Sequence, residues 1–345
     1  MHEMLYNIKV KVKFLPEADW SMFVMRKIGV LTSGGDAPGM NAAVRAVTRA
    51  ALSKGMEVVG IQRGYVGLLN REFIDMNART VSGIIQRGGT CLYTARCPEF
   101  RNMDGVLKGK AVCEEIGLEG LVVIGGDGSF RGAGDLSSVG IPCIGIPGTI
   151  DNDIQCTEYT IGYDTAMNTA MEMIDKLRDT TQSHHRCSVV EVMGRRAGYI
   201  AVNVAIATGA EAAITLERPY DLNTIAAKMT KNKNEDGGKH HFILVVAEGV
   251  GQTENIAREI QEMTGIESRA TILGHVQRGG SPTLRDRVVA TEMGHHAVEL
   301  LEAGQGNRIV GMKGGKIYDI DLAEGLAMNK PFIDHRYDIL VETAY

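Results

Sequence analysis

Several features that mark particular protein classes are missing from this 345-residue sequence. No apolar run approaches the ~20 residues that a membrane-spanning helix needs, which argues against a membrane protein. The six cysteines are scattered without a Cys-x-x-Cys pair, and no secretory signal is recognisable. This usage suits reduced thiols, so we expect a cytoplasmic protein.

The sequence also lacks the composition of linkers and of general polyanion binders. It contains 42 glycines but no Gly/Ser-rich or Pro-rich tract, no repeat and no low-complexity segment. Its net charge of −5 argues against a nucleic-acid or membrane partner. Polyanionic substrates would therefore have to be attracted by local arginines and a metal.

The hydrophobic pattern predicts an α/β fold of two domains, each a mostly parallel sheet flanked by helices. The chain is long enough for two buried cores. We expect long helices at 40–54 and 164–181, a turn at 64–67, and strands at 25–31, 58–61, 121–124, 141–146, 187–193, 213–216, 242–247 and 269–273. Residues 1–24 stand apart as an N-terminal extension, which leaves Met25 as a candidate natural start.

Three of the apolar strands are followed by glycine turns that carry aspartate. The turns lie at 33–36, 125–129 and 147–153, and the last holds two carboxylates, Asp151 and Asp153. One such turn alone is ordinary structural punctuation. Three together indicate a ligand site at the carboxyl edge of a sheet. The first two turns are predicted at helix N-termini, where backbone N–H groups bind phosphate.

Arginines provide the complementary charge. Arg186, Arg195, Arg269 and Arg278 follow or precede strands, and His275 lies near the last of them. Each arginine alone is more often a solvated surface charge. Together they predict a clamp that holds a sugar phosphate through forked hydrogen bonds.

Other nucleotide-binding classes fit poorly. The sequence has no P-loop motif and none of the protein-kinase signatures. The glycines at 126–132 are spaced one residue wider than the dinucleotide fingerprint, and Asp127 in that turn would repel a pyrophosphate. An NAD-linked enzyme is therefore the weaker interpretation.

Five segments, 29–43, 125–129, 147–153, 191–195 and 274–282, resemble the bacterial ATP-dependent 6-phosphofructokinase family. The resemblance runs in order and with matching spacing from about Met25 to the C-terminus. It implies transfer of the ATP γ-phosphoryl group to the 1-hydroxyl of fructose 6-phosphate in glycolysis. It also implies an ATP-binding domain at 25–162 plus 277–327 and a sugar-phosphate-binding domain at 163–276 plus 328–345.

The resemblance further implies individual roles. Asp151 would be the base, with Thr149 and Asp153 around it, and Asp127 would hold Mg²⁺ on the nucleotide phosphates. Arg195 would stabilise developing charge, while the Gly35 N–H would face the transferred phosphoryl group. The implied ATP contacts are Gly35, Arg96, Cys97, Gly126, Asp127, Gly128 and Ser129. The implied sugar-phosphate contacts are Thr149, Ile150, Asp151, Arg186, Met193, Gly194, Arg195, Glu248, Arg269, His275, Val276, Gln277 and Arg278.

Arg186 and Arg269 would reach the neighbouring subunit's site, which implies a homotetramer. An effector site for ADP as activator and phosphoenolpyruvate as inhibitor is implied as well. Its residues would be Arg45, Arg49, Arg178, Gly209, Ala210, Glu211, Lys239, His240 and His241. The sequence departs from this pattern at Ala78 and Gly237, where relatives carry basic residues, so regulation follows less directly than catalysis.

Two rivals remain at this stage. A pyrophosphate-dependent phosphofructokinase shares the fold and the acceptor, but such relatives carry Asp in place of Gly128 and Lys in place of Gly148. A non-catalytic nucleotide-sensing subunit would not need the base at Asp151. The glycines and the intact carboxylate favour an ATP-dependent enzyme.

Overall fold

The computed structural model describes residues 25–235 and 238–344, so the predicted extension at 1–24 and Gly237 lie outside the described residues. The strands are β1 (Lys27–Thr32), β2 (Glu57–Ile61), β3 (Phe73–Met76), β4 (Gly120–Gly125), β5 (Cys143–Pro147), β6 (Cys187–Val192), β7 (Ala212–Ile214), β8 (Phe242–Ala247), β9 (Ser268–Ile272), β10 (Arg308–Lys313) and β11 (Lys316–Asp321). The helices are α1 (Met40–Ser53), α2 (Gly64–Asn70), α3 (Met103–Glu115), α4 (Asp127–Ser138), α5 (Tyr163–His184), α6 (Tyr199–Thr208), α7 (Leu222–Asn234), α8 (Thr253–Thr264), α9 (Leu284–Glu302), α10 (Leu322–Ala327) and α11 (Asp334–Thr343), with 3₁₀ turns η1 (Glu99–Arg101) and η2 (Gly274–Arg278).

The larger sheet has seven strands in the order β11-β10-β5-β4-β1-β2-β3. Its interior pairings are parallel, whereas β3 and β11 add antiparallel edges. The smaller sheet, β7-β8-β6-β9, is parallel throughout. The predicted fold class, with mostly parallel sheets flanked by helices, is confirmed.

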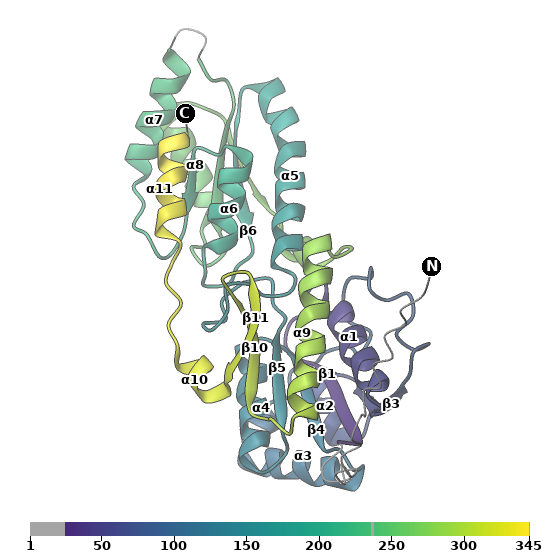
Figure 1. Cartoon of the computed structure of the whole chain (residues 1–345). Helices are drawn as coiled ribbons and strands as arrows, with labels where there is room; N and C mark the ends of the chain where they lie inside the picture. Colours follow the sequence, from purple (N-terminus) through teal and green to yellow (C-terminus); the bar gives the residue numbers. More distant parts are fainter. Residues whose placement is uncertain (1–24, 236–237, 345) are drawn as a thin grey trace, which may run out of the picture.

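The chain passes between the two sheets more than once. After the smaller sheet is complete, α9, β10 and β11 return to the larger one, where β10 pairs with β5. The segment after α10 then crosses back, and α11 packs against α6 and β7. Figure 1 shows the two sheets with their helices as an upper and a lower body, between which α5 and α9 meet. The domain boundaries given above stay a prediction.

The central strands explain why the sequence folds into layers. β4 and β8 are buried along their whole length, as expected of parallel strands covered by helices on both faces. Helix α9 lies against α1 at close range, since a Cβ at Gly294 would come within 2.7 Å of the Ala46 Cβ. Only glycine therefore permits this approach.

One local prediction is wrong. Residues 64–67, expected to form a turn, begin helix α2, although Gly64 and Gly67 favour turns. The helix places Tyr65 in the core, where its ring stacks on Phe100 at 4.1 Å between ring centroids. Its hydroxyl also donates to the Ser129 carbonyl at 2.6 Å. Tertiary packing of Tyr65 outweighs the local preference of the glycines.

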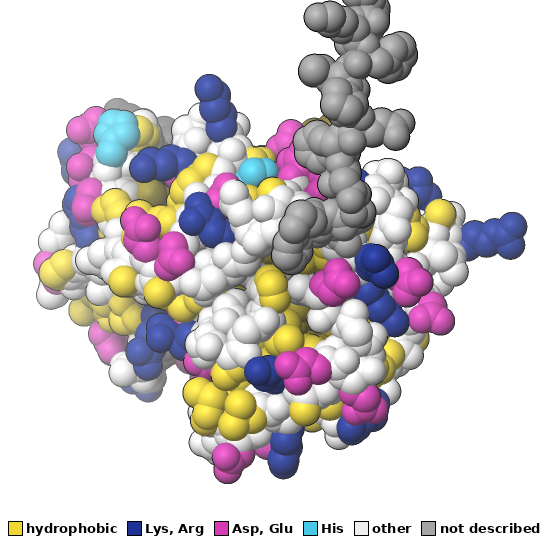
Figure 2. Space-filling model, turned by 60° about the horizontal axis from the view of Figure 1, so that its bottom comes forward, with side chains coloured by type: hydrophobic (Ala, Val, Ile, Leu, Met, Phe, Trp, Pro, Cys, Tyr) yellow, Lys and Arg dark blue, Asp and Glu magenta, His cyan; other side chains and the backbone are white. Residues whose placement is uncertain are grey.

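The surface carries charges of both signs. In the face drawn in Figure 2, lysines and arginines are interspersed with aspartates and glutamates. No helix in the described ranges, 25–235 and 238–344, is both long enough and apolar enough to cross a membrane.

A buried carboxylate ties the start of α9 to the loop that leads into α5. Asp286 is fully buried and accepts hydrogen bonds from the Tyr159 hydroxyl (2.6 Å) and from the backbone N–H groups of Gly162 (2.7 Å) and Thr165 (2.9 Å). The Thr165 hydroxyl donates as well, at 2.5 Å. Asp286 thus fixes the passage from the larger sheet to the smaller one.

We predict that Asp286→Ala lowers the free energy of unfolding by at least about 2 kcal/mol, because several buried donors lose their acceptor. Denaturant unfolding would measure the loss. The control is Glu292→Ala on the exposed face of the same helix, which should change stability by less than about 0.5 kcal/mol. Equal stability of the two variants would contradict the role given to Asp286.

Candidate active site

The turns after β1, β4 and β5 meet at the carboxyl edge of the larger sheet, because these strands are neighbours in it. Hydrogen bonds join the turns to one another. The Ser33 N–H donates to the Ile124 carbonyl, and the Gly148 N–H donates to the Gly125 carbonyl, each at 2.9 Å. The aspartates of the second and third turns are thereby brought to one place, as the sequence predicts.

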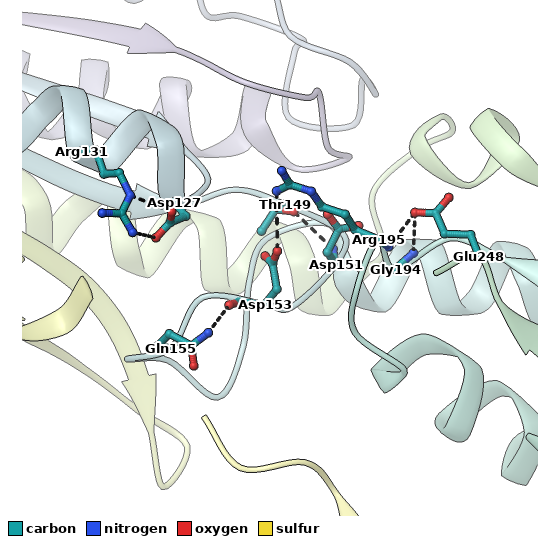
Figure 3. Close-up of polar contacts among 9 residues, drawn as sticks. All are labelled: Asp127, Arg131, Thr149, Asp151, Asp153, Gln155, Gly194, Arg195 and Glu248. Carbon is teal, nitrogen blue, oxygen red and sulfur yellow. Dashed lines mark hydrogen bonds and ion pairs between the residues drawn. The ribbon is translucent and has the colours of Figure 1, made fainter. Parts of the chain in front are cut away.

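The turn after β4 leads directly into a helix. Asp127 is the first residue of α4, and its carboxylate pairs with Arg131 one turn later, at 3.0 Å (Figure 3). A Cβ added at Gly126 or Gly128 would meet nothing within 4 Å beyond its chain neighbours. The glycines therefore leave open space at the positive end of the α4 dipole, where a phosphate group is favoured.

The turn after β1 differs from the prediction in one respect. Helix α1 begins only at Met40, so the turn at 33–36 does not open a helix, and the predicted helix N-terminus there is wrong. Its positive charge comes instead from Arg278. A Cβ at Gly35 would lie 3.1 Å from the Arg278 Nη2 atom, so glycine lets the guanidinium approach the backbone.

Asp151 is a largely buried carboxyl group. Burial raises its pKa to about 6, and the negative charges of Asp153 and Glu248 act in the same direction. The guanidinium groups of Arg278 and Arg195 oppose this rise. Asp151 is thus a stronger base than an exposed aspartate, yet it is ionised at neutral pH.

Asp153 shares this environment. Burial raises its pKa, and Asp127 adds to the rise, whereas Arg195 lowers it. The Arg195 Nη1 atom lies 4.0 Å from the Asp153 carboxylate. In Figure 3 the Arg195 side chain reaches from the smaller sheet toward Asp151 and Asp153. Carboxylates of one sheet and a cation of the other therefore face one another.

Glu248 fixes the backbone that presents this arginine. It follows β8, and its carboxylate accepts hydrogen bonds from the N–H groups of Gly194 (3.3 Å) and Arg195 (2.5 Å). Both residues have positive φ, 143° and 59° respectively. The left-handed conformation of a bulky residue such as Arg195 is strained, and the carboxylate stabilises it.

Gln277 forms a hydrogen bond with the backbone just before the same turn. Its side chain is fully buried, and Oε1 accepts from the Met193 N–H at 2.8 Å, while Nε2 donates to the Ala166 carbonyl at 3.4 Å. Both polar atoms are thus used within the chain. Gln277 consequently orients Met193, which was predicted to contact the sugar.

Arg186 and Arg269 lie elsewhere. They stand at the amino ends of β6 and β9, opposite the end that carries Arg195. Both pair with Glu267, at 2.7 Å and 2.8 Å. A six-residue strand spans roughly 20 Å, so the prediction of one four-arginine clamp is wrong within a single chain. Their reach into a neighbouring subunit stays a prediction.

Part of the predicted effector set forms a cluster. Arg178 hydrogen-bonds to the Thr208 carbonyl and lies 3.3 Å from the His241 ring. Lys239 pairs with the buried carboxylate of Glu211. Burial lowers the pKa of His241, and the nearby Arg178 and Lys239 lower it further. The cluster therefore combines cations with one carboxylate.

The other predicted residues are placed as follows. His240 stacks on His185, Gly209 caps α6, and Ala210 is buried beside it. Arg45 and Arg49 lie on α1. Burial lowers the pKa of Arg45, and the nearby charge of Arg49 lowers it further. Among the remaining residues of the predicted ATP and sugar-phosphate sets, the exposed ones are Arg96, His275 and Val276. Cys97 is half-buried, and Ser129 and Ile150 are buried.

Two residues near the site were not predicted. Arg131 lies four residues after Asp127, and this spacing places both side chains on one face of the helix. The spacing in the sequence could therefore have predicted the ion pair. Lys330 donates from its Nζ atom to the Asn152 carbonyl at 2.6 Å across a large sequence distance. No local signal marks Lys330.

Comparisons with known proteins identify relatives of this chain. A family model described as Phosphofructokinase matches residues 27–301. A Clostridium botulinum (strain Hall) protein named ATP-dependent 6-phosphofructokinase is 55% identical over 315 residues, which are 91% of this chain and 98% of the relative.

Solved structures give a similar result. Phosphofructokinase from Saccharomyces cerevisiae superposes with a TM-score of 0.81 at 32% identity, over 92% of this chain and 48% of the yeast chain, so this chain spans about half its length. A pyrophosphate-dependent phosphofructokinase from Marinobacter aquaeolei gives a TM-score of 0.80 at 20% identity over 92% of this chain and 91% of the other, which shows the fold alone.

The environment of Asp151 predicts an unusual titration. In a ¹³C NMR titration of protein labelled at aspartate carboxyl carbons, the Asp151 signal should change near pH 6, with the protonated form below and the ionised form above. Asp151→Asn provides the assignment, since it removes this signal alone. A titration of Asp151 near the ordinary value of about 3.9 would contradict the burial argument.

Proposed function

This chain belongs to the phosphofructokinase family, and on that premise we propose that it is an ATP-dependent 6-phosphofructokinase. The reaction transfers the γ-phosphoryl group of ATP to the 1-hydroxyl of fructose 6-phosphate and yields fructose 1,6-bisphosphate and ADP. One observation carries the proposal. Asp151, a half-buried carboxyl group with a pKa of about 6, lies between the open glycine turn at Asp127 and the turn that presents Arg195.

Asp151 acts as the general base. The 1-hydroxyl oxygen forms a bond to the γ-phosphorus while the bond from that phosphorus to the β,γ-bridging oxygen breaks, and the hydroxyl proton passes to Asp151. A carboxylate whose pKa lies near neutral pH accepts this proton better than an ordinary aspartate. The Asp151 N–H donates to the Thr149 hydroxyl oxygen at 3.3 Å, and this bond helps to fix the turn that carries the base.

The glycine turns bind the nucleotide phosphates. Helix α4 begins at Asp127, and open space lies beside Gly126 and Gly128, so a phosphate group can approach the backbone at the start of the helix. The Arg278 guanidinium lies beside Gly35. Arg195 extends to the same place from the smaller sheet and stabilises charge on the transferred group. Phosphoryl transfer depends mainly on such positioning and charge neutralisation.

Asp127 suits Mg²⁺. Its carboxylate is partly exposed beside open space, and Mg²⁺ commonly takes one or two carboxylates together with phosphate oxygens and water. Binding of Mg²⁺ in this way does not require a larger set of protein ligands. The described residues contain no cluster of three or more His, Cys, Asp or Glu side chains that could hold a metal ion. Mg²⁺ held there by Asp127 would neutralise negative charge on the nucleotide phosphates.

The sugar phosphate binds between the sheets. Glu248 and the backbone at Met193 and Gly194 line the sugar side, and His275 and Arg278 hold its phosphate group. In a homotetramer Arg186 and Arg269 would complete the neighbouring site. Regulation by ADP and phosphoenolpyruvate at the cluster around Arg178, and a cytoplasmic location, belong to the same proposal.

Two glycines support ATP as the donor. The open space at Gly128 leaves room for the α-phosphate and nucleoside. At Gly148 a Cβ would press on Ile124 and Met40, at 3.1 Å from each, so a lysine there would require the core to shift. Both positions therefore favour the nucleotide over pyrophosphate.

Asp151→Asn should lower kcat by roughly 10²–10⁴-fold, because the variant keeps the shape of the turn but has no proton acceptor. KM for both substrates should change far less. Steady-state kinetics would measure this, with Asp104→Asn on exposed α3 as the control for the same substitution. Near-normal turnover of the Asp151 variant would exclude this residue as the base.

Gly128→Asp should reduce ATP-dependent turnover by at least about tenfold, since opposed like charges cost several kcal/mol. The matched control is Gly128→Ala, which adds a methyl group to open space without charge and should keep most of the activity. An equal loss of ATP-dependent turnover in both variants would mean that the added volume, rather than the added charge, lowers the activity. Full activity of the aspartate variant would contradict the place assigned to the α-phosphate.

A further inference from the structure

The segment 328–333 joins α10 to α11 and crosses from the larger sheet to the smaller one (Figure 1). Lys330, in its middle, contacts the turn after β5. Its Nζ atom donates to the Asn152 carbonyl at 2.6 Å, and its backbone N–H donates to the Gln155 Oε1 atom at 2.5 Å. Asn152 belongs to the turn that carries the base, and Gln155 follows that turn by two residues.

These bonds act on the peptide groups that flank Asp153. The Asn152 carbonyl belongs to the peptide between Asn152 and Asp153, and Gln155 Nε2 donates to the Asp153 carbonyl at 3.2 Å. Lys330 thus holds one peptide directly and the next through Gln155. In the described ranges of the chain, it is the one charged side chain that donates to the backbone of residues 148–155.

The turn needs such support. Asn152 has a φ of 53°, a left-handed conformation that is unfavourable for residues other than glycine. Its side chain is almost fully buried, and although Nδ2 donates to the Glu158 carbonyl at 3.2 Å, Oδ1 has no partner in the described part of the chain. The bend between the two catalytic carboxylates is therefore not stabilised by Asn152 alone.

Contacts on the other side fix Lys330 itself. Its ammonium group lies 5.0 Å from the centre of the Tyr199 ring on α6, a cation–π contact. The Tyr199 hydroxyl donates to the Pro331 carbonyl at 3.1 Å, and the Phe332 ring packs 6.0 Å from that of Tyr199. The segment is thus anchored on the smaller sheet while Lys330 reaches the turn of the larger one.

The charge is retained despite this burial. Burial lowers the pKa of Lys330 to about 8, whereas the negative charge of Asp153 raises it. The Lys330 amino group is therefore mostly protonated at neutral pH. The hydrogen bond to the Asn152 carbonyl is charge-assisted and stronger than a neutral one.

We propose that Lys330 is a positioning residue for phosphoryl transfer, whose ammonium group holds the bend at Asn152 so that Asp151 and Asp153 face the acceptor hydroxyl. The inference rests on the proposed function. Lys330 does not itself touch the reacting atoms, and it acts through the peptide between Asn152 and Asp153. Its contact with Tyr199 links the geometry of the base to the position of the smaller sheet.

The test compares Lys330→Met with Lys330→Arg. Methionine keeps the apolar stem over Tyr199 but removes the donor, and kcat should fall on the order of tenfold to a hundredfold, the worth of a hydrogen bond to a charged group. KM for ATP should stay close to that of the unmodified protein, because no hydrogen bond joins Lys330 to the turns after β1 and β4 in the described residues. The thermal midpoint should fall by no more than about a few degrees, the effect of losing one hydrogen bond. Arginine should restore most of kcat. Lys316→Met, an exposed change in the β10–β11 hairpin, is the matched control.

The outcomes separate the claims. An unchanged kcat in Lys330→Met would overturn the inference, as would joint loss of kcat, ATP binding and thermal stability without rescue by arginine, which indicates a merely structural lysine. A Lys330→Met chain that does not fold would indicate the same. Absence of phosphofructokinase activity in the unmodified protein would instead reject the proposed function.

Discussion

Carboxylates crowd together at one edge of the larger sheet. Burial raises the pKa of both Asp151 and Asp153. The charge of Asp153 raises the pKa of Asp151 further, and the charge of Asp127 raises that of Asp153. Such a group is stable only if cations surround it. Arg195 and Arg278 arrive from segments distant in sequence, and Lys330 arrives from the last crossing between the sheets. Placing these cations requires the chain to pass repeatedly between its two sheets.

This constraint also explains the division of labour between the sheets. Parallel strands deliver their turns to a common edge, so β4 and β5 bring the carboxylates and the open glycine turn together. The smaller sheet contributes the arginine at the end of β6, held by Glu248 at the end of β8. Asp286 forms hydrogen bonds with the loop between the two sheets, and these bonds fix the position of one sheet relative to the other.

Much of this site could be predicted from the sequence because its signals are local. A buried strand followed by glycine and aspartate marks β4 and β5, and the edge on which they meet follows from parallel pairing. What could not be predicted depends on tertiary contacts. Tyr65 packs on Phe100 and turns a glycine-rich stretch into helix α2. Gln277, predicted to contact the sugar phosphate, is fully buried, and both of its side-chain polar atoms form hydrogen bonds within the chain.

The charged residues show the same contrast between local and long-range signals. Arg186 precedes β6 and Arg195 follows it, so the predicted strand at 187–193 already places them at opposite ends of the strand. Lys330 carries no pattern at all, since its role depends on Asn152, which lies 178 positions earlier. Long-range placement of single charged residues is thus the part of the site that sequence reasoning misses.

The central claim is that this site transfers a phosphoryl group from ATP to fructose 6-phosphate. The most direct measurement supplies the purified protein with fructose 6-phosphate, Mg²⁺ and either ATP or pyrophosphate, and follows the products by ³¹P NMR. We expect fructose 1,6-bisphosphate and ADP in equal amounts with ATP. Product formation with pyrophosphate but not with ATP would contradict it.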